Sequence, residues 1–229
     1  MVRTMKSHRK LFILPDTAKC IEIVLDYLAD GMLGHRLTVD KCDRHAGGWE
    51  MLTREAILST RRPFLNSRIS NAQVEWFLDR GRSAPFASLE PDDDIREANP
   101  VENGGLYDRM LNVYEHFWTQ APAGVSVGKI HKVLYVMRPR LFPILDSRVQ
   151  RLLKPNAVAV AEQTRLGRGE YDRGKSNYWG AVRLLQIGAD QTLDAIRKEL
   201  LKSEDDFIRQ SHAFLTDLRL LDMVLWKVN

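Results

Sequence analysis

The residues with the clearest chemical potential lie in one segment of the chain, between positions 127 and 149. A stretch with two lysines is followed by a turn that contains Pro139 and Pro143, and then by Asp146. Proline cannot donate the backbone hydrogen bonds that a helix interior requires, so the pattern predicts a helix, a turn and a second helix. Asp146 falls where the second helix begins. A carboxylate at such a position is held by backbone N–H groups and could face a cleft.

Asp146 is therefore the candidate catalytic residue, because a positioned carboxylate can activate water or stabilise the positive charge of a breaking sugar bond. The glycine and the cationic side chains around it could bind phosphates. This candidate nucleic-acid-binding set comprises Gly128, Lys129, Lys132, Arg138, Arg140 and Arg148. A structural alternative stays open for each: a plain helix cap for the aspartate, solvated surface positions for the lysines, and turn-pinning contacts for the first two arginines.

A second candidate site is the turn at residues 43–49. Asp43, Arg44 and His45 precede two glycines and Trp49. Paired glycines permit positive φ and the close approach of a ligand, so the three polar side chains could converge there. A tight turn whose tryptophan anchors in the core would explain the same residues.

Charge is unevenly distributed along the chain, although the net charge is only +4 and the isoelectric point is near 9.1. Residues 90–102 are mostly acidic, whereas residues 129–154 are strongly basic. The basic segment could bind phosphates, and the alternative is an ordinary helix face paired with acidic residues elsewhere. Known phosphate-loop, serine-elbow and zinc-protease motifs are absent and the histidines are dispersed, so we expect neither a metal nor a cofactor.

Helical periodicity recurs along the chain, and strand-like alternation is confined to short fragments, so the sequence predicts an all-α fold. Apolar stripes and capping residues predict the following helices: 17–30, 71–80, 106–117, 126–137, 190–200 and a closing segment that ends at 226. Loops are expected over 40–48, 83–105 and 164–176.

The length of 229 residues suits a single globular helical domain over residues 11–229, in one lobe or two, preceded by a flexible basic arm over residues 1–10. No apolar run is long enough to cross a membrane, so no membrane partner is expected. Cys20 and Cys42 are isolated in the sequence, which is typical of a reduced, cytoplasmic protein.

Several stretches together resemble a bacterial family, domain-of-unknown-function family 6308. In that family a lysine-containing helix precedes Arg-Pro-Arg-Leu, a proline and an aspartate, as at Arg138–Asp146 here. The other similar stretches are 43–49, 91–94, 177–179 and 221–226. The resemblance runs from about residue 40 to the end and departs at Cys42, where the family usually has a tyrosine. It implies a shared fold and no established activity.

A more distant resemblance is to helix-hairpin-helix DNA glycosylases. Residues 127–129 resemble half of their glycine hairpin, and residues 143–149 resemble the stretch that holds their catalytic aspartate, although the first hairpin glycine and the threonine after the aspartate do not match. The resemblance implies that Asp146 acts on a sugar, that Lys129 or Lys132 binds phosphate or attacks as an amine, and that a flipped base enters a pocket. Trp118, Tyr135 or Trp179 would stack on that base.

Three functions follow from these patterns. The first is a nucleic-acid-binding domain related to helix-hairpin-helix glycosylases, with DNA as its partner. The second is an active base-excision enzyme that uses Asp146. The third is a non-enzymatic interaction or defence-associated protein, whose basic segment meets an acidic partner. We rank the first slightly ahead, because the basic segment and the hairpin-like stretch coincide.

Overall fold

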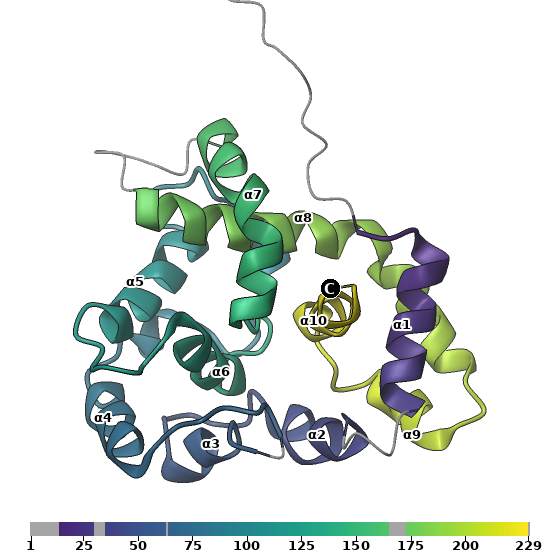
Figure 1. Cartoon of the computed structure of the whole chain (residues 1–229), viewed down its shortest axis with the longest axis horizontal. Coiled ribbons are helices and arrows are strands. Elements are labelled where there is room, and N and C mark those ends of the chain that lie inside the picture. The colour runs from purple at the N-terminus through teal and green to yellow at the C-terminus, as the bar shows by residue number, and fades with distance from the viewer. Residues whose placement is uncertain (1–13, 30–34, 63, 165–172, 229) are drawn as a thin grey trace, which may run out of the picture.

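The computed structural model describes residues 14–29, 35–62, 64–164 and 173–228, with the backbone alone for 173–179 and 189–191. Helices joined by turns and irregular segments make up the fold (Figure 1). In chain order they are α1 (Thr17–Ala29), α2 (His35–Lys41), the 3₁₀ helix η1 (Asp43–His45), α3 (Arg54–Leu58), α4 (Asn71–Gly81), η2 (Phe86–Ser88), η3 (Ile95–Glu97), α5 (Leu106–Trp118), α6 (Val127–Met137), α7 (Ser147–Gln163), α8 (Arg173–Lys202), α9 (Asp206–Ser211) and α10 (Asp217–Lys227). The all-α prediction is confirmed.

Local sequence sets where many of these helices begin. Ser70 accepts a hydrogen bond from the Gln73 N–H at 3.2 Å, and the Gln73 side chain accepts one from the Ser70 N–H, which closes a capping box on α4. The side chains of Ser126 and Thr216 cap α6 and α10 by accepting a hydrogen bond from a backbone N–H three residues on, without the reciprocal bond. Such side chains satisfy first-turn N–H groups that have no partner within the helix.

The predicted helix boundaries agree with the structure in the middle of the chain and differ from it toward the C-terminal end. The helices expected over 71–80, 106–117 and 126–137 correspond to α4, α5 and α6. The helix expected over 190–200 is the second half of the longer α8. The closing segment is two helices, α9 and α10, because the chain turns between them.

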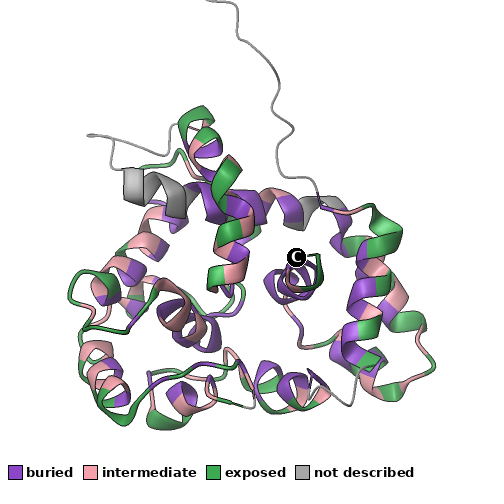
Figure 2. Cartoon of the chain, in the orientation of Figure 1, coloured by how far each residue is buried: buried purple, intermediate pink, exposed green. Residues whose placement is uncertain are grey.

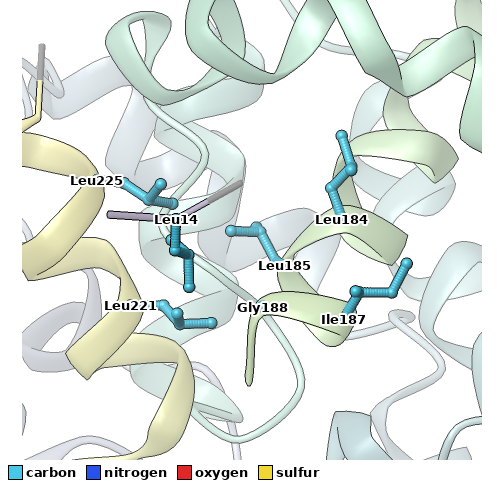
Figure 3. A pocket seen from close by; sticks show the side chains of 7 residues that line it. All are labelled: Leu14, Leu184, Leu185, Ile187, Gly188, Leu221 and Leu225. Carbon is cyan, nitrogen blue, oxygen red and sulfur yellow. The ribbon is translucent and has the colours of Figure 1, made fainter. Parts of the chain in front are cut away.

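Helix α10 lies at the centre of the molecule and is buried along most of its length (Figures 1 and 2). It contacts α1, α7 and α8. On one side Leu221 and Leu225 meet Leu14 and the α8 residue Leu185, around a void of only about 10 Å³ (Figure 3). That volume admits about one water molecule, so this part of the core is closely packed.

The two long helices α7 and α8 cross in close contact. A Cβ atom built at Gly180 of α8 would lie 1.7 Å from the carbonyl oxygen of Ala157 in α7. Only a residue without a side chain can occupy this crossing, because any carbon there would overlap the opposing backbone. Gly180 therefore sets the distance between the two helices.

The structure agrees only in part with the loops expected from the sequence. The expected loop at 40–48 contains the end of α2 and η1, and the segment 83–105 contains η2 and η3 between irregular stretches. In the loop expected over 164–176, residues 165–172 lie outside the described residues and 173–176 belong to α8. The expected arm over residues 1–10 also lies outside them. Among the described helices, none combines the length and the apolar character that crossing a bilayer would require.

Candidate active site

A cavity of about 430 Å³ opens where α1, α2, α6 and α10 meet the start of α7 and the loop at 60–67. Its charged lining residues are Arg62, Lys132, Asp146, Arg219 and Asp222, and its aromatic ones are Tyr27, His35, Phe64 and Trp226. The volume falls within the range of roughly 300–1,000 Å³ that is usual for small-molecule sites. The cavity is thus large enough for one nucleotide-sized group.

Lys132 reaches this cavity from α6. Its side chain is half-buried, and within the described part of the chain its amine makes no hydrogen bond and no ion pair. Burial lowers the pKa of Lys132, and the negative charges of Asp146 and Asp222 partly oppose that effect. A lowered pKa enlarges the fraction of neutral amine, which is the form that attacks carbon.

Asp146 occupies the N-cap of α7, as the sequence predicts. Its Oδ1 atom accepts hydrogen bonds from the N–H groups of Arg148 at 2.9 Å and Val149 at 3.0 Å. Its Oδ2 atom has no hydrogen-bond partner among the residues that the structure describes. The carboxylate is therefore fixed by one oxygen, while the other is available in the cavity that Asp146 lines.

The first turn of α6 packs directly on this aspartate. A Cβ at Gly128 would lie 3.2 Å from the Asp146 Cα and 3.4 Å from the Leu145 carbonyl oxygen. The absence of a side chain at position 128 lets the two helix starts approach each other. Lys132 lies one helical turn beyond Gly128 on the same face of α6, so the glycine contact also brings Lys132 and Asp146 to one cavity.

Behind the cavity, α10 contributes a buried ionic network centred on Arg219. The Arg219 Nε atom donates to Asp43 Oδ2 at 2.9 Å, and its terminal nitrogens donate to Asp222 and to the Tyr27 hydroxyl. Tyr135 donates its hydroxyl proton to the other Asp43 oxygen at 2.8 Å. Each buried charge is thus paired and hydrogen-bonded, which is the condition for placing charges inside a protein.

Asp222 is the carboxyl group of this network that lines the cavity, together with Arg219 and Tyr27. Burial raises its pKa to about 6, although Arg219 and Lys132 oppose the shift. A carboxyl group with a pKa near neutrality can both give and take a proton under ordinary conditions. Arg219, which lies one turn earlier in α10, holds the Asp222 carboxyl group in place.

Three helices, α1, α2 and α10, supply one cluster of aromatic rings in the cavity wall. The rings of Tyr27 and His35 stack at a centroid distance of 4.0 Å, and Trp226 meets both of them edge-on. The guanidinium of Arg148 lies 5.2 Å from the centre of the Trp226 ring. Such a wall offers apolar area and π faces to a planar or sugar-like ligand.

The predicted phosphate-binding residues do not share one surface. Gly128, Lys132 and Arg148 lie at or beside the cavity. Lys129 points elsewhere, because its amine donates to the Gln73 side chain of α4 at 2.9 Å. Arg138 is buried and donates to the carbonyl oxygens of Met137 and Trp49, so it pins the turn after α6.

Arg140 is exposed and belongs to the same turn. Its side chain donates to the Asp92 carbonyl oxygen at 3.4 Å, and its own carbonyl accepts from the Ile95 N–H at 3.1 Å. The acidic segment at 90–102 therefore lies against part of the basic segment. Both contacts are made to backbone carbonyl oxygens, so they join the two segments without an ion pair.

The residues of the second candidate site are not brought together. Asp43 is buried and turned toward Arg219, whereas Arg44 and His45 line a separate open cavity of about 620 Å³. Arg44 also pairs with Asp40. Among the described residues, no group of three or more His, Cys, Asp or Glu side chains could hold a metal ion.

His131 precedes Lys132 in α6 and is wholly buried, with its Nδ1 2.7 Å from the Pro143 carbonyl oxygen. Of the aromatic residues expected to stack on a base, neither Trp118 nor Tyr135 lines the cavity. Trp118 is exposed and stacks on Tyr114, away from the cavity lining. Tyr135 is buried beside Asp43, and the side chain of Trp179 lies outside the described residues.

Sequence reasoning missed the contribution of α10, from which Arg219, Asp222 and Trp226 enter the site. A signal was present, because Arg219 and Asp222 interrupt the apolar run over residues 218–226 of the closing helix. Charged side chains are rarely buried unless they are paired, so such positions indicate a partner in the fold. The loop residues Arg62 and Asn66 carried no comparable signal.

One known protein family matches most of the chain, including much of this site. The model of the family of unknown function DUF6308 matches residues 48–229, which includes Lys132, Asp146 and Asp222 but neither Tyr27 nor the turn at Asp43. No curated protein and no solved structure matches the chain. Since the match covers well over half of its length, the chain belongs to the family of unknown function DUF6308.

Proposed function

We propose that this chain is an enzyme of the base-excision type, which acts on the sugar of a nucleotide held in the cavity. Lys132 would be the amine nucleophile and Asp146 the assisting carboxylate. The observation that carries the proposal is their shared cavity: a half-buried amine without a hydrogen bond or ion pair among the described residues, and a carboxylate with one oxygen left unbonded there.

The chemistry needs only these groups and water. The neutral amine of Lys132 attacks C1′ of the sugar, and the bond from C1′ to the base breaks, so the base leaves with the bonding electrons and takes up a proton. Opening of the sugar ring then gives an imine between the lysine and C1′. Water hydrolyses the imine to an aldehyde and the free amine. Asp146 stabilises the positive charge at C1′ and accepts the proton released by the attacking amine.

Two further features support this proposal. Asp222 has a pKa of about 6 and faces the same cavity, so it can return a proton to the leaving group. The stacked pair of Tyr27 and His35, together with Trp226, provides a wall for the flipped nucleotide.

The resemblance to helix-hairpin-helix glycosylases joins residues 127–129 and residues 143–149 in one site. The close contact of Gly128 with Asp146 supports that pairing. The N–H groups at the start of α6 and the side chain of Arg148 would contact the nucleic-acid backbone. Arg138, which is buried in the turn, is left out of this interface.

The test is borohydride trapping of the imine on a duplex oligonucleotide that contains one abasic site, whose ring-opened sugar is an aldehyde. The wild-type protein should form a covalent adduct, and Lys132→Met should form none. Lys129→Met is the matched control, because Lys129 lies on the same helix, is also half-buried and is bonded to Gln73 outside the cavity. An equal adduct yield from Lys132→Met, or no adduct from the wild type, would refute the proposed nucleophile.

Binding of the duplex is measured in parallel, as a function of salt. Salt-dependent binding without any adduct would leave a nucleic-acid-binding domain without catalysis, since phosphate contacts release counterions on binding. Absence of both binding and trapping would remove nucleic acid from the function of this chain.

A further inference from the structure

The mouth of the cavity carries an arginine that the proposed chemistry does not use. Arg62 is exposed, lines the cavity, and donates from Nε to the side-chain oxygen of Asn66. Among the described residues, no carboxylate lies within ion-pair distance of it. Arg36 and Arg54, in contrast, are paired with acidic residues. Arg62 is thus an exposed guanidinium in the cavity lining that no described carboxylate pairs with.

Two hydrogen bonds hold described residues on either side of Arg62 in place. The base of the loop at 60–67 is closed by the hydrogen bond from the Ser67 N–H to the Thr60 carbonyl at 3.0 Å. Its middle is tied to α2, because the Thr38 hydroxyl donates to the Phe64 carbonyl at 3.2 Å. A cation on such a loop is positioned before any ligand arrives, so little ordering is needed when one binds.

Asn66 is the residue that orients this arginine. It has a φ of +53°, and it is the one non-glycine residue with positive φ among those that the structure describes. Asparagine tolerates this conformation better than most residues, yet the conformation is sparsely populated and tends to be retained at functional sites. The Asn66 side-chain oxygen accepts a hydrogen bond from Nε of Arg62, and one N–H of the guanidinium is thereby fixed. Its two terminal nitrogens remain as a fork for an oxyanion.

The cavity differs in charge between its buried part and its exposed part. In the buried part the cations Arg219 and Lys132 stand beside the carboxylates of Asp222 and Asp146, whereas Arg62 is exposed and has no carboxylate within ion-pair distance among the described residues. The inner charges offset one another, so the excess positive charge that attracts an anion lies at Arg62. The arrangement therefore fits a ligand with an uncharged reacting part inside and an anionic group at the mouth.

We infer that the substrate carries a phosphate next to its reacting sugar, and that Arg62, positioned by Asn66, is the phosphate contact that selects it. This inference rests on the proposed function, which supplies the sugar inside the cavity. The phosphate could belong to a free sugar phosphate or to a nucleic-acid strand, because both present the same oxyanion next to the sugar. Arg62 binds this group and takes no part in bond making.

The experiment compares borohydride trapping rates with 2-deoxyribose 5-phosphate and with 2-deoxyribose. For the wild type the phosphorylated sugar should react about tenfold faster at subsaturating concentration, as expected for one charge-assisted contact. Arg62→Gln should bring the ratio of the two rates toward one. Asn66→Gly, which keeps the positive φ and removes the amide, should give an intermediate ratio. Arg68→Gln, an exposed arginine outside the cavity lining, should keep the wild-type ratio.

The outcomes separate the two proposals. A wild-type ratio near one, or a ratio in Arg62→Gln equal to that of the wild type, would overturn the phosphate contact while the trapping itself upheld the nucleophile. Failure of both sugars to react would overturn the proposed function and this inference with it. An abasic duplex as a third substrate identifies the source: a higher rate than with 2-deoxyribose 5-phosphate, lost in Arg62→Gln, assigns the contact to a strand phosphate.

Discussion

Gly128 and Asp146 face each other so closely that a methyl group at position 128 would lie 3.2 Å from the Asp146 Cα. The contact joins the start of α6 to the start of α7 and brings Lys132 to the cavity that Asp146 lines. A small displacement here would move the carboxylate relative to the amine, although it would leave the core intact.

Replacing Gly128 with alanine tests this contact. We expect Gly128→Ala to lower the trapping rate with abasic DNA at least severalfold, because a misplacement of a fraction of an ångström is costly at a reacting centre. The free energy of unfolding should change by less than about 1 kcal/mol, since alanine favours the helix and offsets the crowding. Trapping kinetics and urea denaturation measure the two effects. A severe loss of stability with normal kinetics in the folded fraction would contradict the prediction.

Asp146 can be tested separately as a cap and as a catalytic group. Asparagine caps helices about as well as aspartate does, so Asp146→Asn should keep a melting temperature close to that of the wild type. The same variant should lose release of damaged bases from a duplex, because the amide cannot stabilise a cation or take up a proton. Asp146→Ala should lose both the activity and roughly 1 kcal/mol of stability. If Asp146→Asn released bases at the wild-type rate, the carboxylate would be a cap alone.

Arg219 should be among the residues that contribute most to stability. Arg219→Met leaves Asp43 and Asp222 buried without their cation, and breaking a buried ion pair in this way costs about 3–5 kcal/mol. Arg209→Met removes a comparable arginine from an exposed pair with Asp206 and should cost less than about 1 kcal/mol. Chemical denaturation of both variants checks the difference. Similar small losses would mean that the network contributes little.

The burial of His131 predicts how the stability of the protein depends on pH. Burial lowers its pKa from 6.5 to about 4, although the hydrogen bond to the Pro143 carbonyl opposes the shift. Between these values the unfolded chain binds the proton and the folded chain does not, so this contribution to stability rises with pH over that range. The free energy of unfolding of the wild type minus that of His131→Asn should therefore grow by about 3 kcal/mol from pH 4 to pH 6.5. A constant difference across that range would show that His131 does not titrate as its burial requires.

Gly180 tests the crossing of α7 and α8. A methyl group there would overlap the Ala157 carbonyl oxygen at 1.7 Å, and backbone cannot yield as a side chain can. Gly180→Ala should destabilise the protein by about 3 kcal/mol or more. Gly188→Ala, in the same helix, would place its methyl group in ordinary contact with the side chains of Leu14 at 3.4 Å and Leu221 at 3.7 Å, and should be neutral or stabilising by up to about 1 kcal/mol. Thermal melts of the pair give the comparison, and equal melting temperatures would exclude the close crossing.

The sequence by itself determined the features that depend on neighbours within a few residues. Helical periodicity gave the all-α class, and short polar side chains marked helix starts such as Ser70 and Ser126. The prolines at 139 and 143 ended one helix, and Asp146 began the next, as expected from their backbone chemistry. These outcomes follow because capping and periodicity are decided locally.

Tertiary structure alone decided which side chains meet. Lys129 and Lys132 are equivalent in the sequence, yet in the folded chain the first donates a hydrogen bond to Gln73 of α4 and the second lines the cavity. Asp43 and Arg219 stand 176 positions apart, and only the folded chain pairs them. Contacts of this kind depend on the summed packing of several helices, which no local pattern encodes. The sequence therefore predicted part of the candidate site, namely its carboxylate and its amine. It did not predict the α10 residues, the aromatic wall or the residues at the mouth of the cavity.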